Sequence, residues 1–547
     1  MQELLGTGIT DPKLRESAAP GAAAAATFSS PALPGPGIAP ASTDVVAFLG
    51  RCLKGPVNEP VSIRSFAEYE QVFGGLSSTA TLAHAIEQFF EQGGNHALVV
   101  RVCSGGAAPT LDLRAGDDTL ALQGLCPGTR EHLRVAVDYD GIGQQDADLF
   151  NLVVQRVRAP GSERVETQET FRRLSVLSGS AREIGRVLTG SKLVRLHGSL
   201  PRQRPDITTR RDARQLAGWV ECNRDGDDGQ PLSDYDIIGS EAGYSGLFAL
   251  VGGPQFSFLY IPPLAPDHDV GVSALFVAAR FCRRAHAMLV VDPPLDWQDA
   301  EDALGGMRGW PFKSPDALMC FPPVYAMDRA SGRLVRHAPG AAAVGMIVRG
   351  EEQGAPAPWS LREMPLLRPS LQPAAFVDDT QRERLARMGV NVLAATRSAA
   401  RGSQVLRTLA GERSAPPETG ELAQRRLTQF IGESIERGTR WVTVEGNSER
   451  SRERVSRQVE RFLAQLGAEG ALAGTERNRH YFVLCDERVN GPREQLAGEF
   501  RFVYGFEPRG TGRRQNVLVV HRPASSESRQ ANINEHAARE LRMDPPP

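Results

Sequence analysis

Cysteine is scarce in this chain, and its spacing excludes two kinds of site. The chain has only seven cysteines, which are Cys52, Cys103, Cys126, Cys222, Cys282, Cys320 and Cys485. An odd number without any Cys-x-x-Cys pair argues against both a disulfide framework and a zinc site. We expect reduced thiols that are mostly buried as small apolar side chains.

A surplus of either charge is also missing. The 63 basic and 65 acidic residues give a formal net charge of −2, so no overall field attracts nucleic acid or an anionic membrane. No stretch reaches the roughly 18 uncharged apolar residues that a membrane helix needs. The best candidate, Val270–Phe281, is interrupted by Arg280. Because residues 1–20 lack a continuous apolar core, no secretion signal is predicted. We expect a soluble product of the cytoplasm without membrane insertion.

The chain is too long for one hydrophobic core. At roughly 150 residues per domain, 547 residues predict three or four domains. Hydrophobic residues make up 41% and charged residues 23%, which is typical of a folded globular protein and not of a disordered one.

The first half divides into three parts. Residues 1–43 are rich in Ala, Pro, Gly and Ser and predict an extended N-terminal arm. Residues 44–105 predict an N-terminal α/β segment, with the strand VVAFLG, two helices and the strand ALVVRV. Residues 106–225 consist of short alternating segments separated by Gly, Asp and Pro, which predict an inserted, mainly β domain.

The second half predicts two domains and a tail. Residues 226–411 contain the strand FSFLYIPP, the helix VSALFVAARFCRRA and the strand HAMLVVDPP, a pattern that favours a parallel sheet covered on both faces. Residues 412–522 predict an α+β domain with helices at RRLTQFIGESIERG and SRERVSRQVERFLAQLG, and strands at RWVTVEG, HYFVLCDE, FRFVYGFEP and NVLVVHR. Residues 523–547 are polar and predict a flexible tail. The fold class is therefore a multidomain combination of α/β and α+β.

Patterns that would indicate catalysis are incomplete. There is no G-x-S-x-G elbow, since YSGL at Tyr244–Leu247 lacks the flanking glycines. His286 begins an apolar strand, where a satisfied core histidine is more common than a general base. The enzyme alternative is an α/β hydrolase or peptidase that uses Asp292, His286 and a serine.

Cofactor and metal motifs are also incomplete. His84 and His96 have no second ligand at i+4. The DGDDG run at Asp225–Gly229 resembles a cation loop but lacks the distal Glu of an EF-hand. No Gly-Lys-Ser/Thr occurs for phosphate binding. We predict no catalytic, cofactor-binding or metal residues, with calcium at the DGDDG loop as a minor alternative.

Several blocks, in the same order, resemble the contractile tail sheath family of myophage tails, R-type pyocins and extracellular contractile injection systems. They are FLGRCLKGPVNEPVSIRSFAEYEQVFGG, LAHAIEQFFEQGGNHALVVRV, YDIIGSEAGYSGLFAL, FLYIPP, LVVDPP, RRLTQFIGESIERGTRWVTVEGN, FLAQLGAEGALAG, YFVLCDE and GFEP. The resemblance covers most of the chain apart from the arm, the β insertion and the tail. The chain departs from the family in its arm, which holds PGPGIAP in place of a PG-V-Y-x-E-E type opening, and in the segment GAPAPWSL.

The resemblance implies a fold and a function. It implies a subtilisin-like central domain and an α+β C-terminal domain on the inner wall beside a tube. The implied function is structural and not enzymatic: a sheath protomer that polymerises helically around an inner tube and contracts to drive the tube through a target envelope. Implied partners are further copies, the inner tube protein, and baseplate and cap proteins. Assembly would take place in a bacterial cytoplasm, followed by residence in a phage tail or a released phage-tail-like particle. A specialised, non-contracting sheath paralogue at the baseplate or cap end is the alternative.

Two sets of residues are candidates for contacts between subunits. We expect the last apolar strand, together with the arm, to add edge strands to the sheets of neighbouring subunits. The residues of this strand are Val517, Leu518, Val519 and Val520. Charged residues of the C-terminal helices could form a solvated face or contact the tube or another subunit, and the resemblance favours contact. They are Arg425, Arg426, Glu433, Glu436, Arg437, Arg440 and Glu445.

Overall fold

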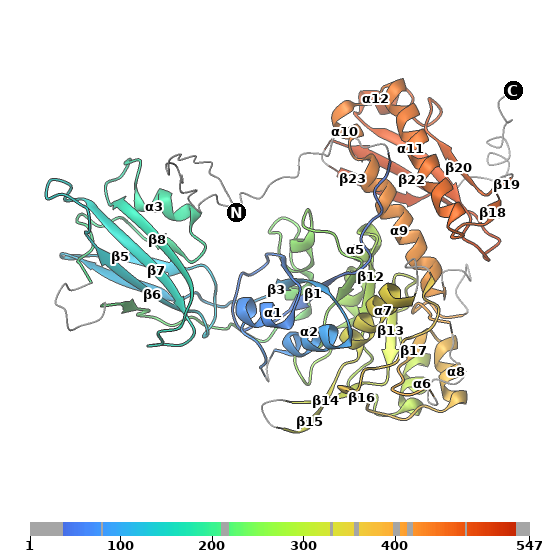
Figure 1. Ribbon diagram of the computed structural model, residues 1–547, viewed down its shortest axis with the longest axis horizontal. Coiled ribbons are helices and arrows are strands. Elements are labelled where there is room, and N and C mark those ends of the chain that lie inside the picture. The colour runs from blue at the N-terminus through green and yellow to red at the C-terminus, as the bar shows by residue number, and fades with distance from the viewer. Residues whose placement is uncertain are drawn as a thin grey trace, which may run out of the picture.

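The computed structural model shows three bodies along the chain (Figure 1). A β domain lies at one end of the longest axis, a central α/β domain lies in the middle, and an α+β domain lies on the far side of the central domain. The structure describes residues 37–77, 80–208, 218–328, 332–354, 360–397, 405–412, 420–475, 478–523 and 525–531. Residues 1–36 of the predicted arm and residues 532–547 of the predicted tail lie outside this description.

The central domain is built on one seven-stranded sheet. Its order is β17 (Val390–Val392), β13 (Ala317–Phe321), β12 (Met288–Val291), β11 (Phe258–Tyr260), β1 (Val45–Gly50), β3 (His96–Arg101) and β2 (Val61–Ile63). All neighbours pair in parallel except β2, which runs antiparallel to β3. Since β1 lies between β3 and β11, the segments 44–105 and 226–411 share one sheet. The prediction of two separate parts is therefore wrong here, because pairing between strands far apart in sequence leaves no local signal.

Helices bury both faces of this sheet, as near-continuous apolar strands require. Along β1, Val46 and Phe48 enter one core, while Ala47 and Leu49 enter the other. The helices on the Val46 side are α1 (Phe66–Phe73), α2 (Thr81–Gln92) and α7 (Gly340–Gly354). Those on the Ala47 side are α4 (Asp234–Ile238), α5 (Val272–Arg284), α6 (Ala300–Gly309) and α8 (Asp379–Arg387). A small sheet of β14 (Val324–Met327), β15 (Leu334–His337) and β16 (Leu371–Pro373) adjoins them.

The insertion is mainly β, as predicted. One sheet has the order β10 (Val220–Glu221), β6 (His132–Asp138), β7 (Leu149–Val157) and β8 (Val165–Ser175). The second has the order β4 (Thr110–Ala115), β5 (Asp118–Gly124) and β9 (Val194–His197), and a short helix, α3 (Ile184–Val187), lies between β8 and β9. Alternate residues of these strands form a separate apolar core, which includes Leu120, Val135, Phe150 and Leu152. The insertion therefore has a core of its own.

The C-terminal domain places helices on an antiparallel sheet. The sheet order is β20 (Tyr481–Leu484), β21 (Phe500–Phe506), β22 (Gln515–Arg522) and β23 (Ser525–Gln530). The helices are α9 (Leu422–Thr439), α10 (Val442–Glu445), α11 (Glu449–Ala468) and α12 (Pro492–Leu496), and a minor hairpin joins β18 (Gly474–Thr475) to β19 (Asn478–Arg479). Ile38 and Ala41, which lie far away in sequence, belong to the core of this domain.

Two local predictions for this domain are wrong. The segment RWVTVEG was predicted as a strand, but its centre forms α10. Trp441 and Val442 are buried while Val444 is 76% exposed, so the alternation that a half-buried strand needs is absent. The tail was predicted to be flexible from residue 523, but β23 pairs with β22 from Ser525 to Gln530. The polar sequence of β23 has no pattern that predicts a strand, and the strand forms because its backbone pairs with β22.

Candidate functional site

The joint between the central and C-terminal domains is formed by one face of α9. Arg425, Arg426, Gln429, Glu433 and Glu436 follow helical spacing, so they share one side of the helix. Each of them contacts the central domain through a hydrogen bond or an ion pair. A helix face that the sequence marks as charged therefore docks against a neighbouring domain of the same chain.

Asp316, in the loop before β13, anchors the start of α9. Its carboxylate is fully buried, and its Oδ1 accepts a hydrogen bond from Arg425 Nε at 2.8 Å. Its Oδ2 accepts a hydrogen bond from Arg283 Nε at 2.8 Å. Burying a carboxylate without partners is unfavourable in free energy, and here two guanidinium groups supply the partners. Asp316 therefore holds the start of α9 against the central domain.

Arg426 forms the second anchor. Its Nη2 lies 2.7 Å from Glu351 Oε2 on α7, and both side chains are almost fully buried. The guanidinium also lies 4.2 Å from the ring centroid of Phe258, and Nη2 donates to Thr43 O at 3.1 Å. Burial raises the pKa of Glu351 to about 7, against the opposing effect of Arg426. The ion pair thus links α9 to the sheet, to α7 and to the N-terminal segment.

A third set of contacts surrounds His286, just before β12. Its Nε2 lies 3.1 Å from Glu436 Oε2 and 2.7 Å from Ser528 Oγ of β23, and Ser528 also donates to Glu436. Burial acts to raise the pKa of Glu436, but its bonds with His286 and Ser528 hold that pKa below its ordinary value. One contact group therefore joins the central domain, α9 and the last described strand.

The His286 group does not have the geometry of a hydrolase. In a Ser-His-acid triad the serine and the acid bind opposite ring nitrogens, whereas both partners here use Nε2. Asp292 lies at the other end of β12, about 20 Å from His286 at strand spacing. It binds the hydroxyl of Tyr260 at 2.6 Å and the backbone N–H of Gly340 at 2.8 Å. The Asp292–His286 arrangement of the hydrolase alternative is not formed.

The N-terminal segment lies along the same helix. Ala41 N donates to Ser434 Oγ at 2.9 Å, and Arg437 Nη2 donates to Pro40 O at 2.8 Å. Ile38 packs against Gly438, where a Cβ would come within 2.8 Å of it. A glycine at this position lets the segment approach the helix closely.

The charged residues predicted to contact other subunits thus divide into two groups. Five of them, Arg425, Arg426, Glu433, Glu436 and Arg437, contact the central domain or the N-terminal segment. Arg440 is exposed, and Glu445 lies 3.0 Å from Arg454 on the surface. Sequence reasoning missed Asp316, Glu351 and Gln255, the central-domain partners of the first group, because single polar residues in distant segments carry no signal of their pairing.

Comparison with known structures identifies the fold. A sheath tail protein from Listeria innocua matches with a TM-score of 0.55 and 12% sequence identity, over 89% of this chain and 96% of that one. The chain has the fold of a tail sheath protein.

Two further sheath structures give lower scores. A sheath tail protein from Desulfitobacterium hafniense has a TM-score of 0.47 and 13% identity, over 88% of this chain and 97% of that one. The contracted sheath of PVC, an extracellular contractile injection system, has a TM-score of 0.46 and 13% identity, over 95% and 96% of the two chains. No protein-family model and no curated protein sequence matches the chain.

The insertion and the C-terminal domain lie at opposite ends of the strands of the central sheet. The insertion follows the carboxyl ends of β1 and β3, where Arg101 Nη1 donates to Gly55 O at 2.7 Å and Nη2 donates to Pro127 O at 2.8 Å. The C-terminal domain docks at the amino ends of β12 and β13, through His286 and Asp316. Polar contacts of buried side chains therefore fix both outer domains on the central one.

The predicted strand-exchange residues are internal to the C-terminal sheet. Val517, Leu518, Val519 and Val520 lie in β22, which pairs with β21 on one side and with β23 on the other. Since both edges of β22 are occupied within the chain, the exchange hypothesis for these residues would require β23 to leave first. The edge strands of this sheet are β20 and β23.

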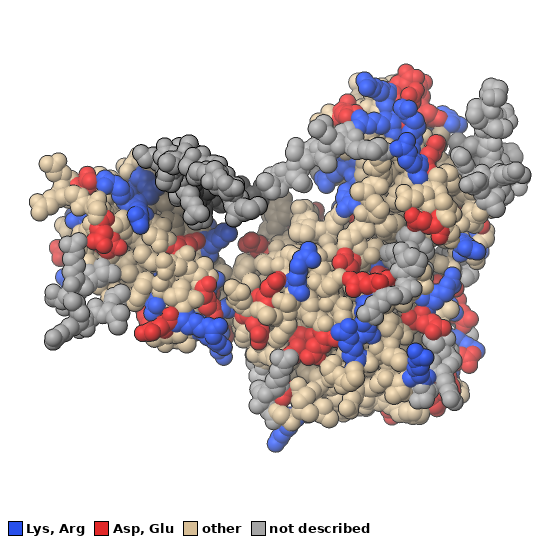
Figure 2. Space-filling view, in the orientation of Figure 1, with Lys and Arg blue, Asp and Glu red and all other residues tan. Residues whose placement is uncertain are grey.

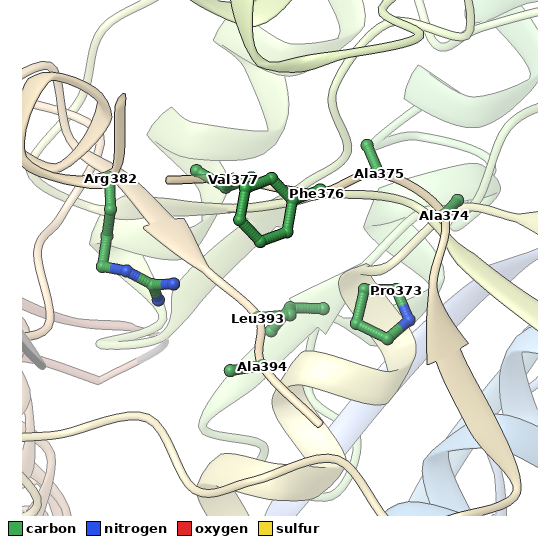
Figure 3. A pocket seen from close by; sticks show the side chains of 8 residues that line it. All are labelled: Pro373, Ala374, Ala375, Phe376, Val377, Arg382, Leu393 and Ala394. Atoms are coloured by element: carbon green, nitrogen blue, oxygen red, sulfur yellow. The ribbon is translucent and has the colours of Figure 1, made fainter. Parts of the chain in front are cut away.

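An apolar hollow of about 300 Å³ follows β16 (Figure 3). Eight residues line it, and they are Pro373, Ala374, Ala375, Phe376, Val377, Arg382, Leu393 and Ala394. Arg382 is the only charged side chain among them, so the lining offers no acid–base pair. Across the described ranges, no group of three His, Cys, Asp or Glu residues could hold a metal ion. Nor does any helix in those ranges have the length and apolar character to cross a membrane.

Proposed function

We propose that the chain is the structural sheath protomer of a contractile injection machine. In this proposal it polymerises helically around an inner tube, and the polymer contracts to drive the tube through a target envelope without catalysing a reaction. The observation that carries the proposal is the sheath-tail fold over nearly the whole chain. The proposal includes a subtilisin-like relationship for the central domain, the inner tube, baseplate and cap proteins as partners, and assembly in a bacterial cytoplasm before residence in a phage tail or phage-tail-like particle.

The first and last described segments support a linked polymer. Ile38 and Ala41, in the first described segment, are buried in the C-terminal domain. β23, the last described strand, lies at an edge of the same domain's sheet. At the other edge, no described strand pairs with the outer side of β20. Strands at free sheet edges can pair with segments of neighbouring copies and join them while the body of each subunit moves.

The two fixed junctions support rigid-body motion of each subunit. Breaking the joint would leave the carboxylate of Asp316 buried with one partner fewer, and the Arg426–Glu351 pair would be separated. Such separations are costly. Contraction is therefore proposed to change the contacts between subunits while the domains within each subunit keep their arrangement.

The N-terminal link can be tested by deleting residues 1–36, which leaves the segment along α9 in place. The shortened protein should stay folded and monomeric, whereas the full chain should form long striated tubes in negative-stain images. Normal tubes from the shortened protein would contradict the arm link. Short or capping structures from the full chain would favour the non-contracting paralogue.

A longer deletion serves as the comparison. Removing residues 1–43 also removes Ile38 and Ala41 from the C-terminal core, together with the backbone acceptors of Arg437. We expect this deletion to lower the melting temperature, and the deletion of residues 1–36 to leave it unchanged. The shorter deletion is therefore the one that separates assembly from folding.

A further inference from the structure

The insertion carries a group of arginines whose charges have no counter-ion within the described chain. Arg172 lies near the end of β8, and Arg182 and Arg186 lie in and beside α3. All three are exposed, and none forms an ion pair with a described carboxylate. We call these three residues the arginine corner. Figure 2 shows basic side chains gathered beside α3 on the face in view.

The arginine corner is held in place by its backbone. Arg182 donates through Nη2 to the carbonyl of Arg172, so the two residues are in contact. The connecting loop is closed by Ser175 N donating to Arg182 O at 2.8 Å and by Gly179 N donating to Glu183 Oε2 at 2.7 Å. Glu183 is thus engaged by the backbone. A fixed loop presents guanidinium groups with less loss of conformational entropy when a partner binds.

A surface of opposite charge lies on the central domain. It surrounds the carboxyl ends of β11 and β12 and contains Asp267, Asp269 and Asp296, which we call the acidic edge. The segments 261–272 and 291–307 that form it contain no lysine or arginine of their own. One guanidinium lies beside them, because half-buried Arg336 donates to Leu295 O at 3.0 Å and to Trp297 O at 2.6 Å. Asp269 Oδ2 accepts a hydrogen bond from Leu295 N at 3.1 Å and so ties the two segments together. Burial raises the pKa of Asp269, and the nearby charge of Asp296 adds to this effect.

We propose that the arginine corner of one copy docks on the acidic edge of another copy. An open helical polymer needs heterologous contacts, in which two different surfaces of the same chain meet. These two surfaces differ in position and are opposite in charge, and complementary charges set the register of such contacts. The inference rests on the proposed function and assigns the β insertion a role in the lattice.

Charge reversal tests the contact. The triple variant R172E/R182E/R186E should raise the concentration needed for polymerisation by about tenfold, as three exposed charge pairs would predict. D267R/D296R should have an effect of the same sign. The matched control is R130E/R158E/R164E, which changes the net charge equally. Arg164 directly precedes β8 and lies about 26 Å from Arg172 at strand spacing. This control should polymerise like the parent.

Combining the two reversals gives the decisive comparison. The variant with both the arginine corner and the acidic edge reversed should recover most of the lost polymerisation, because opposite charges meet again. Circular dichroism and melting of the monomers confirm that each variant is folded. Either reversal without effect, an equal loss in the control, or no recovery in the combined variant would overturn the docking. Failure of the parent chain itself to polymerise would instead overturn the proposed function.

Discussion

Arg425 Nε donates to Oδ1 of Asp316 at 2.8 Å, and this contact joins the start of α9 to the loop before β13. The two residues are 109 positions apart in sequence, and the carboxylate is fully buried. The same face of α9 also binds Glu351, Gln255 and His286 of the central domain. These contacts fix the C-terminal domain beside the amino ends of the central strands.

Replacing Arg425 by Met should destabilise the joint. Asp316 would keep only Arg283, so we expect a loss of about 2 kcal/mol in the free energy of unfolding, measured by urea titration. Arg114→Met is the control, since Arg114 is 81% exposed and 3.7 Å from its partner Asp206, and such pairs contribute under about 0.5 kcal/mol. Equal stability of the two variants would contradict the anchoring role.

Replacing Arg101 by Met should loosen the insertion. Arg101 is 1% exposed, and its guanidinium donates to Gly55 O and Pro127 O. Loss of these hydrogen bonds should lower the free energy of unfolding by about 2 kcal/mol. It should also speed proteolysis in the two segments, near residues 105 and 226, that connect the insertion to the central domain. The exposed Arg158 offers the control substitution Arg158→Met, which should leave the cleavage pattern unchanged. Unaltered cleavage in both variants would mean that other contacts fix the insertion.

His521 should make the C-terminal sheet sensitive to acid. Its ring bonds Thr439 Oγ1 and Ser526 Oγ, each at 2.8 Å. Burial lowers the pKa of His521 to about 4, while Glu436 acts to raise that pKa and Arg440 to lower it. Since the unfolded chain takes up the proton near pH 6.5, stability is complete above that pH and falls by about 3 kcal/mol as the pH drops toward 4.

Hydrogen exchange of peptides from β22 and β23 measures this effect locally. Protection should fall between pH 6.5 and 4 after correction for the intrinsic exchange rate. His521→Gln should flatten this dependence. His337→Gln is the control, because burial also lowers the pKa of His337 to about 4 but this residue lies in the central domain. A pH dependence that persists in His521→Gln would assign the sensitivity to another group.

Arg440 should contribute to binding the inner tube. It is exposed, whereas five of the other predicted charges contact the central domain or the N-terminal segment and Glu445 pairs with Arg454. Arg440→Glu should weaken co-sedimentation with the tube protein by about fivefold, as one exposed charge pair predicts, and should leave sheath polymerisation unchanged. Arg457→Glu on α11 is the control. Tube binding equal to that of the parent would remove Arg440 from the proposed contact.

Local patterns predicted much of the fold. The apolar runs that predicted strands form β1, β3, β11 and β12 of the parallel sheet. The insertion was recognisable as β from its alternating segments. These features depend on residues close together in sequence, so their signal is visible in the sequence itself.

Long-range pairing was not predictable in this way. The placement of β23 depends on backbone bonds to β22 and on Ser528 meeting His286 and Glu436. The helix α10 replaced a predicted strand because the packing of Trp441 and Val442 decided their backbone conformation. Of the candidate charges, the sequence located the helix face on α9, but it could not show that this face docks on the central domain.

The sequence by itself determined the apolar strands of the parallel central sheet and the alternating strands of the insertion, because apolar periodicity and turn residues act over short stretches of chain. It did not show that segments 44–105 and 226–411 join in one sheet, because strand pairing between distant segments is set by the fold. Only the tertiary structure decided that residues 38–44 lie along α9, that Asp316 and Glu351 engage its arginines, and that β22 is covered on both edges. These contacts join segments far apart in sequence. Their energy comes from burying charged and polar groups together, and the partners of such groups are set by the fold.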